Sequence, residues 1–348
     1  MKFTYYLLIA LGLLTTPMVS AQDETFSADG FECRVTAADA VEITCAGSKV
    51  EGTLVIPGII ENGGVDYTVT SIAAEAFKEA GITELDLSAA TGLQCIGESA
   101  FAECGQLNSV KFPALELSSL TEIGALAFHH DTALSSMNLQ DTRIEVLEPL
   151  FTKDKYDEVY FDDLTELMLP ETLKEIKSYA LQFLGLRSIT IPASVTAFGE
   201  GVLEGTIYLE EFYWKGAQLT RLPMNTFLGE DALRIVYFLT NNDIDPDGLT
   251  DKHFFMCHKD RLNVYVTQHS YDILVANGYT NENAIYSTLV ADTEWVPEPD
   301  PEDPSAIAAP MMKAGMQADG AIYNLQGVRM VQPRKGELYI KGGKKYVK

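Results

Sequence analysis

Basic residues are scarce in this chain of 348 residues, which has 25 Lys and Arg against 50 Asp and Glu and a formal net charge of −25. Nucleic acids and anionic membrane surfaces are bound through clustered Lys and Arg, so this balance argues against both as partners. The hydrophobic share of 47% is nevertheless that of a folded protein. An acidic coat of this kind is typical of an extended exported protein that has to stay soluble.

Motifs that position common catalytic groups are also missing. The sequence has no phosphate-cradling glycine loop, no nucleophile elbow and no HExxH motif. Two clusters contain metal-ligating residue types, His129-His130-Asp131 and the set His253, Cys257, His258 and Asp260. The first is expected in an exposed turn, and the spacing of the second matches no common zinc pattern. The sequence therefore predicts no enzyme, no cofactor and no metal site.

Long apolar runs are absent after the first 21 residues. Residues 1–21 have the three parts of a secretory signal peptide, with Lys2 in a basic region, an apolar stretch from Tyr5 to Leu14, and small residues up to Ala21 for cleavage. The apolar stretch is too short to span a bilayer, and no cysteine follows it to carry a lipid anchor. We expect an exported protein that is located at the cell surface, on the outer membrane or outside the cell.

Cysteine is rare as well, with five residues in the whole chain. Export permits disulfides without requiring them. Cys33 and Cys45 flank the turn of a predicted β-hairpin centred near residue 39, where they would lie roughly opposite each other, and they are a candidate disulfide. Cys104 and Cys257 each lie three residues after a phenylalanine, and this recurring position favours packing in a core.

What the sequence does contain is a block that returns about every two dozen residues, an isoleucine followed by Ala-Phe. Clear copies are 71–77 (SIAAEAF), 95–101 (CIGESAF) and 122–128 (EIGALAF). The aromatic residue or leucine that closes each block lies at Phe77, Phe101, Phe128, Phe151, Leu181, Leu203 and Phe227. Self-similarity at this period indicates a solenoid, and we expect these closing residues to form its buried spine.

A second periodic feature, an apolar-x-apolar triplet, falls between the blocks and predicts short β-strands with two side chains in and one out. The triplets begin at Leu85, Val110, Met137, Leu167, Ile189, Phe212, Val236 and Val264. Several run into proline, which cannot donate to a ladder and marks the end of a strand. We expect these strands to form a parallel sheet on one face of the solenoid, with short turns or helices opposite.

The middle residue of each triplet should point outward from this sheet. In order these residues are Asp86, Lys111, Asn138, Met168, Thr190, Tyr213, Tyr237 and Tyr265. Adjacent strands lie about 4.8 Å apart, so the three tyrosines would form a stacked ladder. Exposed aromatic rings on a rigid sheet suit sugar rings or the apolar side chains of a protein partner.

Glu211 and Asn263, which precede their triplets, would share the outward face and supply hydrogen bonds. The candidate binding face is therefore Tyr213, Tyr237, Tyr265, Glu211 and Asn263. The alternative is purely structural, because tyrosine favours strands and stacked rings stabilise a sheet.

The chain divides into five parts. These are the signal peptide (1–21), an N-terminal β cap (22–66), the repeat solenoid with its C-terminal cap (67–294), a proline-rich acidic linker (295–306) and a small β tail (307–348). An exposed hydrophobic end of a solenoid has to be covered, which is the role expected of the cap. The tail has eight Lys and Arg against two acidic residues, a net charge of +6 on a chain that totals −25.

The stretches 189–199 (ITIPASVTAFG) and 96–104 (IGESAFAEC) resemble the BspA-like leucine-rich repeat family, whose pattern is roughly a strand ending in Ile-Pro, then Ser-Val, Thr-x-Ile-Gly, Ala-Phe, Cys and Leu. The resemblance covers about 200 residues. It implies a leucine-rich-repeat solenoid, α/β leaning to mainly β, in a non-catalytic surface protein of Bacteroidetes-like bacteria that adheres to a host extracellular protein or glycan. A carbohydrate-binding accessory protein and an envelope scaffold without a host ligand are the alternatives.

The end of the chain carries a second resemblance. The segments 322–329 (IYNLQGVR), 336–341 (GELYIK) and 344–348 (KKYVK) are similar to C-terminal sorting tails of exported Bacteroidetes proteins. This resemblance implies contact with outer-membrane (type IX) secretion machinery. A small accessory β module with no sorting role is the other interpretation.

Overall fold

The computed structural model describes most of the chain between residues 24 and 278 and five short strands beyond it. The ranges are 24–46, 50–152, 160–214, 219–229, 232–240, 242–249, 262–278, 288–292, 322–323, 329–330, 338–341 and 344–347. The expected signal peptide, the linker 295–306 and the cluster from His253 to Asp260 lie outside these residues. Within them, no helix has the length and apolar character needed to cross a membrane.

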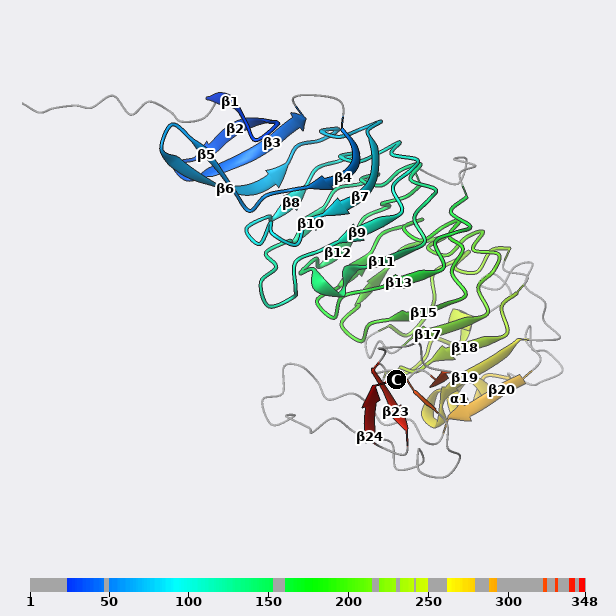
Figure 1. The fold of residues 1–348 in the computed structure, drawn as a ribbon. Helices are drawn as coiled ribbons and strands as arrows, with labels where there is room; N and C mark the ends of the chain where they lie inside the picture. The colour runs from blue at the N-terminus through cyan, green and yellow to red at the C-terminus, as the bar shows by residue number, and fades with distance from the viewer. Residues whose placement is uncertain are drawn as a thin grey trace, which may run out of the picture.

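Short parallel strands follow one another along one side of the molecule in chain order (Figure 1). They are β4 (Glu51–Val55), β7 (Gly81–Asp86), β9 (Ser109–Lys111), β11 (Ser136–Asn138), β13 (Glu166–Met168), β15 (Ser188–Ile191), β17 (Glu211–Trp214), β18 (Ile235–Phe238), β19 (Asn263–Thr267) and β20 (Thr288–Asp292). Hydrogen-bonded parallel groups are β4-β7-β9, β11-β13 and β15-β17-β18-β19-β20. Every predicted triplet overlaps one of these strands, so the predicted parallel sheet on one face is confirmed.

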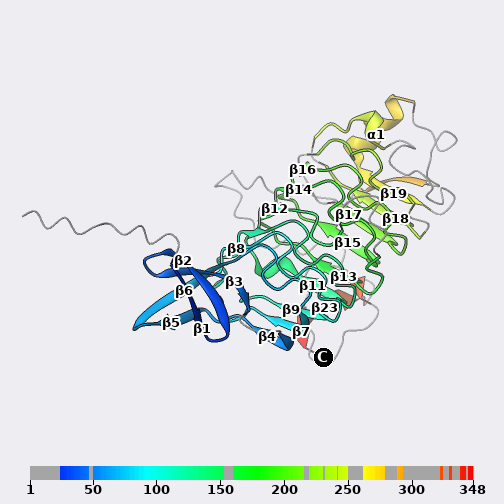
Figure 2. The same cartoon turned by 90° about the horizontal axis from the view of Figure 1, so that it is seen from above.

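The connections opposite this sheet contain more strand than we expected. Two-residue strands form a second series of parallel pairs, β8-β10 and β12-β14-β16, and the isoleucine of the repeated block lies in several of them. Their bounds are β8 (Cys95–Ile96), β10 (Glu122–Ile123), β12 (Val146–Leu147), β14 (Glu175–Ile176) and β16 (Ala197–Phe198). Figure 2 shows β8, β12, β14 and β16 succeeding one another from above. The block is thus a strand followed by a turn.

The glycine after the block isoleucine allows neighbouring repeats to approach closely. A Cβ added at Gly97 would lie 2.4 Å from the backbone nitrogen of Ala74, and one at Gly124 would lie 2.5 Å from that of Glu98. A residue with a Cβ at either position would therefore push one repeat away from the next.

The turns after the block repeat their backbone conformation. Two residues four positions apart have positive φ in six of the turns, namely 75 and 79, 99 and 103, 126 and 130, 179 and 183, 201 and 205, and 225 and 229. The N–H groups then donate to the following repeat, as Glu75 does to the Glu98 carbonyl at 3.0 Å and Phe77 does to the Ala100 carbonyl at 2.8 Å. Backbone hydrogen bonds therefore join the repeats on the turn side as well as through the sheets.

The predicted spine is confirmed. Phe77, Phe101, Phe128, Phe151, Leu181, Leu203 and Phe227 are all buried, with at most 3% of any side chain exposed. The Phe77 and Phe101 rings stack with centroids 5.4 Å apart, and the Phe101 and Phe128 rings stack at 5.7 Å. Such ring pairs contribute about 0.5–1.5 kcal/mol each beyond their buried area.

The N-terminal cap is a β structure, as predicted. It consists of β1 (Thr25–Ala28), β2 (Phe31–Ala37), β3 (Ala40–Ala46), β5 (Ile59–Asn62) and β6 (Val65–Ile72). β2 and β3 form the predicted antiparallel hairpin, and β3 pairs in parallel with β6, which in turn pairs with β8. The cap therefore continues directly into the repeats, and the boundary expected at residue 66 falls inside β6.

At the other end, α1 (Gln268–Ala276) follows β19, and its first turn is capped by the Thr267 hydroxyl, which accepts from the Ser270 N–H. β20 then pairs with β19 and adds one more parallel strand. The tail forms an antiparallel sheet in the order β22-β21-β23-β24, which confirms its short strands. These are β21 (Ile322–Tyr323), β22 (Arg329–Met330), β23 (Leu338–Lys341) and β24 (Lys344–Val347).

The candidate disulfide between Cys33 and Cys45 is wrong, because both cysteines are free thiols. A bulge between Glu32 and Cys33 shifts the hairpin register, so Cys45 lies opposite Glu32 while Cys33 lies opposite Ile43. The Cys33 side chain is buried and that of Cys45 is exposed. Cys104 is buried, as predicted, and its Sγ donates to the Phe77 carbonyl at 3.2 Å. Cys257 lies outside the described residues.

A candidate recognition surface on the sheet

The outward side chains of β15, β17, β18 and β19 form two rows that run across the strands. Strand register aligns Thr190, Tyr213, Tyr237 and Tyr265 in one row, and Ser188, Glu211, Ile235 and Asn263 in the other. Parallel pairing without a register shift produces this alignment, because equivalent residues of successive repeats then lie side by side. The structure therefore brings all five residues of the predicted binding face onto one surface.

The three tyrosines form the predicted ladder. The Tyr213 and Tyr237 ring centroids are 5.1 Å apart with an interplanar angle of 11°, and those of Tyr237 and Tyr265 are 4.5 Å apart with an angle of 13°. All three side chains are partly exposed. Both faces of the central ring, Tyr237, are covered by its neighbours, so this ring presents its edge and not its faces to a partner.

Glu211 is joined directly to the ladder. The Tyr213 hydroxyl donates to the Glu211 Oε2 at 2.7 Å. Burial, and then this hydrogen bond, raise the pKa of Tyr213, so the phenol stays protonated across the physiological range. Asn263 lies two strands from Glu211 in the same row, with Ile235 between them. The surface thus combines an acceptor, an apolar side chain and an amide beside the aromatic row.

Charged groups surround this surface at the start of the strands. The Glu210 carboxylate forms ion pairs with Arg187, at 3.5 Å, and with Arg234. Towards the N-terminal half, the Lys111 ammonium group lies 3.3 Å from the Asp86 carboxylate. Exposed pairs of this kind add little stability, so the main effect of the two Glu210 pairs is to fix the pattern of charge beside the ladder.

Comparison of the sequence with models of known protein families assigns the chain to one family. The family described as "BspA type Leucine rich repeat region" matches residues 70–162 and 157–247, in six copies. The chain belongs to this family. No curated protein matches the sequence of this chain.

Solved structures similar to this BspA-type chain are bacterial leucine-rich repeat proteins. A leucine rich cell surface protein from Faecalibacterium prausnitzii has 17% identity and a TM-score of 0.44, over 70% of this chain and 73% of that one. The leucine rich repeat protein of T. pallidum has 20% identity and a TM-score of 0.36, over 61% and 81%. A leucine-rich repeat protein from Bacteroides ovatus has 16% identity and a TM-score of 0.26, over 72% and 80%.

The histidine cluster of this BspA-type repeat is not arranged as a site. The His129 and His130 rings lie 4.1 Å apart, but the Asp131 side chain is buried, and its Oδ1 accepts the Cys104 backbone N–H at 2.8 Å. Among the described residues, no three His, Cys, Asp or Glu side chains are grouped so that they could hold a metal ion. Asp131 occupies the position of Cys104 in the next repeat, which explains its burial.

Sequence reasoning missed Ile235, which lies between Glu211 and Asn263 and is partly exposed. The signal was present, because Ile235 precedes its triplet by one residue, as Glu211 and Asn263 do. It also missed how the tyrosines would be oriented, since strand spacing fixes the distance between rings but not which part of a ring is exposed.

Proposed function

We propose that this protein is a non-catalytic recognition protein of the cell exterior that binds a partner protein through the C-terminal half of its sheet. The observation that carries the proposal is the ladder of Tyr213, Tyr237 and Tyr265, which is in register on adjacent strands and stacked at 5.1 and 4.5 Å. Membership of the BspA-type repeat family and the sequence features of a signal peptide support export.

A protein partner suits this surface for two reasons. Rings that are already stacked on a rigid sheet lose little conformational entropy on binding, and their edges and hydroxyls offer apolar area together with hydrogen bonds. Glu211 and Asn263 add an acidic acceptor and an amide beside the apolar Ile235. A partner surface with basic and apolar side chains would complement this combination and the net charge of −25.

Glycan binding through the same tyrosines is less favoured. Sugars stack on the open face of an aromatic ring, but the Tyr237 ring has a neighbour on each face at 5.1 and 4.5 Å. The stacking that stabilises the sheet therefore covers both faces of Tyr237 and one face each of Tyr213 and Tyr265, which leaves little ring surface for a sugar.

The test compares binding of the wild type and of ladder variants to a panel of extracellular-matrix proteins and to a glycan array. Tyr237→Thr removes the central ring and keeps a residue that favours strands, as Thr190 does in the same row. Replacing all three tyrosines with phenylalanine keeps the stack and removes the hydroxyls. We expect a matrix-protein signal that falls at least about tenfold with Tyr237→Thr and less with the phenylalanine variant.

Lys111→Thr, at the same row position in the N-terminal half, is the matched control and should keep full binding. Thermal unfolding of each variant separates lost binding from lost structure. Protein binding that is unchanged in a folded Tyr237→Thr variant would refute the proposal, as would binding confined to the glycan array.

A further inference from the structure

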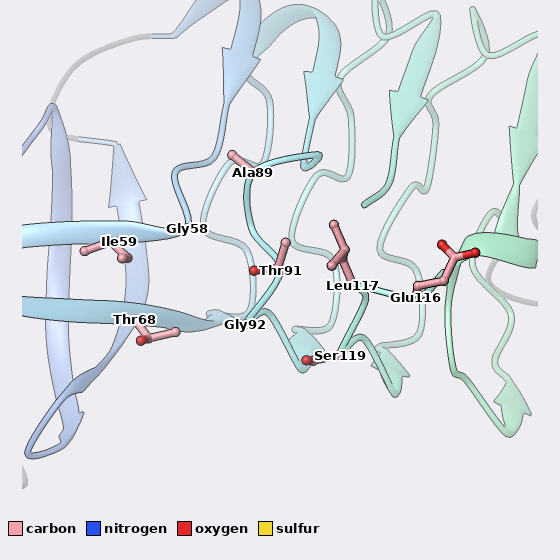
Figure 3. A pocket seen from close by; sticks show the side chains of 9 residues that line it. All are labelled: Gly58, Ile59, Thr68, Ala89, Thr91, Gly92, Glu116, Leu117 and Ser119. Carbon is pink, nitrogen blue, oxygen red and sulfur yellow. The ribbon is translucent and has the colours of Figure 1, made fainter. Parts of the chain in front are cut away.

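An open groove of about 710 Å³ lies where the N-terminal cap meets the first repeats (Figure 3). It is at the opposite end of the solenoid from the tyrosine ladder. Three chain segments form its walls: the cap strands β5 and β6, the loop 87–94 between β7 and β8, and the loop 112–121 between β9 and β10. The groove therefore crosses successive layers of the molecule.

Glycines let the cap and the first repeat approach each other at the base of the groove. A Cβ at Gly58 would lie 2.3 Å from the Ala89 carbonyl oxygen, and one at Gly92 would lie 2.4 Å from the Thr68 Cγ2. Because both contacts are closer than any real Cβ contact, no larger residue fits at either position without movement. The cap and the loop 87–94 are thus in tight contact at Gly58 and Gly92.

The loop 112–121 forms the far wall and is longer than its counterparts. It has ten residues, whereas five (192–196) separate β15 from β16. Hydrogen bonds hold its shape: the Arg143 Nε donates to the Ser118 carbonyl at 2.7 Å, its Nη2 to the Leu115 carbonyl at 3.1 Å, and the Leu117 N–H to the Ala114 carbonyl at 2.8 Å.

This loop holds an apolar side chain out in solvent. Leu117 is 61% exposed on one side of the groove, and Ile59 on β5 is 58% exposed on the other. Exposed apolar residues are ordinary when they are scattered, but two that line one groove, on supported backbone, indicate a contact surface. The hydroxyls of Thr68, Thr91 and Ser119 also line the groove and offer hydrogen bonds.

Charge gives the groove a preference. Glu116 is the one charged residue among the nine that line it. Its side chain is exposed, and its carboxylate makes no ion pair or hydrogen bond with any described residue. A basic group is therefore the complement that this position lacks, and the net charge of the chain, −25, adds to the attraction.

We propose that this groove binds an extended segment of a partner protein in which a Lys or Arg lies next to a large apolar residue. The apolar side chain would contact Leu117 and Ile59, the basic group would pair with Glu116, and the hydroxyls would bond the peptide backbone. Three layers spaced about 4.8 Å apart span about 10 Å, which is the length of roughly three extended residues. This site is separate from the ladder and does not depend on its function.

A random-peptide display library tests the proposal. Peptides are selected for binding to the wild-type protein from Gln22 onward, and the enriched peptides are then sorted against variants. Leu117→Ser and Glu116→Gln change the groove. Met224→Ser and Glu98→Gln remove an exposed apolar residue and an exposed charge elsewhere. We expect enriched peptides to share a Lys or Arg beside Leu, Ile, Met or Phe, and to bind Leu117→Ser at least about tenfold more weakly while the two control variants bind normally.

Glu116→Gln should weaken binding mainly at low salt, because the lost contact is electrostatic. Peptides that bind Leu117→Ser as well as they bind the wild type would overturn the proposal. So would self-association of the wild type that Leu117→Ser abolishes, because the occupant would then be a second copy of this chain. Thermal unfolding of each variant confirms that the fold is intact before binding is compared.

Discussion

Asp131 is a carboxyl group inside the repeat core, and replacing it should stabilise the protein increasingly as the pH rises. Its side chain is fully buried, Oδ1 accepts the Cys104 N–H at 2.8 Å, and Oδ2 has no hydrogen-bond partner among the described residues. Burial, opposed by that one hydrogen bond, raises the pKa of Asp131 from 3.8 to about 8. The folded protein therefore keeps a proton that the unfolded chain releases.

The repeat explains why a proton belongs at this position. At the equivalent positions, the Cys104 Sγ donates to the Phe77 carbonyl at 3.2 Å, and the Thr206 Oγ1 donates to the Leu181 carbonyl at 3.1 Å. Both acceptors are spine residues of the preceding repeat. A protonated carboxyl can donate in the same way, whereas a carboxylate cannot.

The sign and the magnitude follow from the two pKa values. Below about pH 4 both states are protonated, and above about pH 8 both are ionised, so stability falls as the pH rises between these limits. The slope is about 1.4 kcal/mol per pH unit, which separates pH 5 from pH 8 by about 4 kcal/mol.

The assay is urea unfolding, followed by circular dichroism, of the wild type and Asp131→Asn at pH 5, 6, 7 and 8. Asparagine keeps the acceptor for the Cys104 N–H and replaces Oδ2 with a donor that does not titrate. The free energy of unfolding of the variant minus that of the wild type should increase with pH at the slope above. A difference that is the same at every pH would contradict a raised pKa, because Asp131 would then titrate as it does in the unfolded chain.

Three further predictions concern the backbone and the thiols. Gly124→Ala should lower the free energy of unfolding by about 1–3 kcal/mol, since its Cβ would lie 2.5 Å from the Glu98 nitrogen, and an unchanged urea midpoint would contradict the close approach of repeats. Glu79→Gly, at φ 61°, should raise the thermal midpoint by relieving about 1 kcal/mol of strain, whereas Lys78→Gly, outside the left-handed region, should lower it. Cys45 is exposed and should react with a thiol reagent at pH 8 before Cys33 and Cys104, because burial raises the pKa values of Cys33 and Cys104 to about 11 and 12. If Cys33 and Cys45 are labelled only after reduction, the two residues form the disulfide after all.

The architecture was predictable because, in a stack of equivalent repeats, the same buried contact recurs at a fixed interval along the sequence. Phe77, Phe101 and Phe128 recur in the sequence because each packs on the one before it, so the period of the sequence is that of the structure. The tyrosine ladder was predictable for the same reason, since Tyr213 and Tyr237 occupy equivalent positions of strands that pair without a register shift.

Features that depend on non-periodic detail were not predictable. The bulge between Glu32 and Cys33 places Cys45 opposite Glu32 instead of Cys33, and no residue pattern marks it. Asp131 reads as a polar surface residue because its burial depends on its position in the turn and not on its polarity. The groove beside Leu117 arises where the cap meets the ten-residue loop 112–121, so the repeat pattern does not predict it.

Photo-crosslinking from single positions tests directly whether the sheet around the tyrosine ladder is the recognition surface. A photoreactive phenylalanine derivative replaces Ile235, between Glu211 and Asn263, or Glu98, which is exposed in a turn away from the sheet. Each variant is irradiated with the matrix protein that binds the wild type. We expect a covalent adduct from position 235 and none from position 98. An adduct from position 98 alone, with binding intact in both variants, would contradict this expectation.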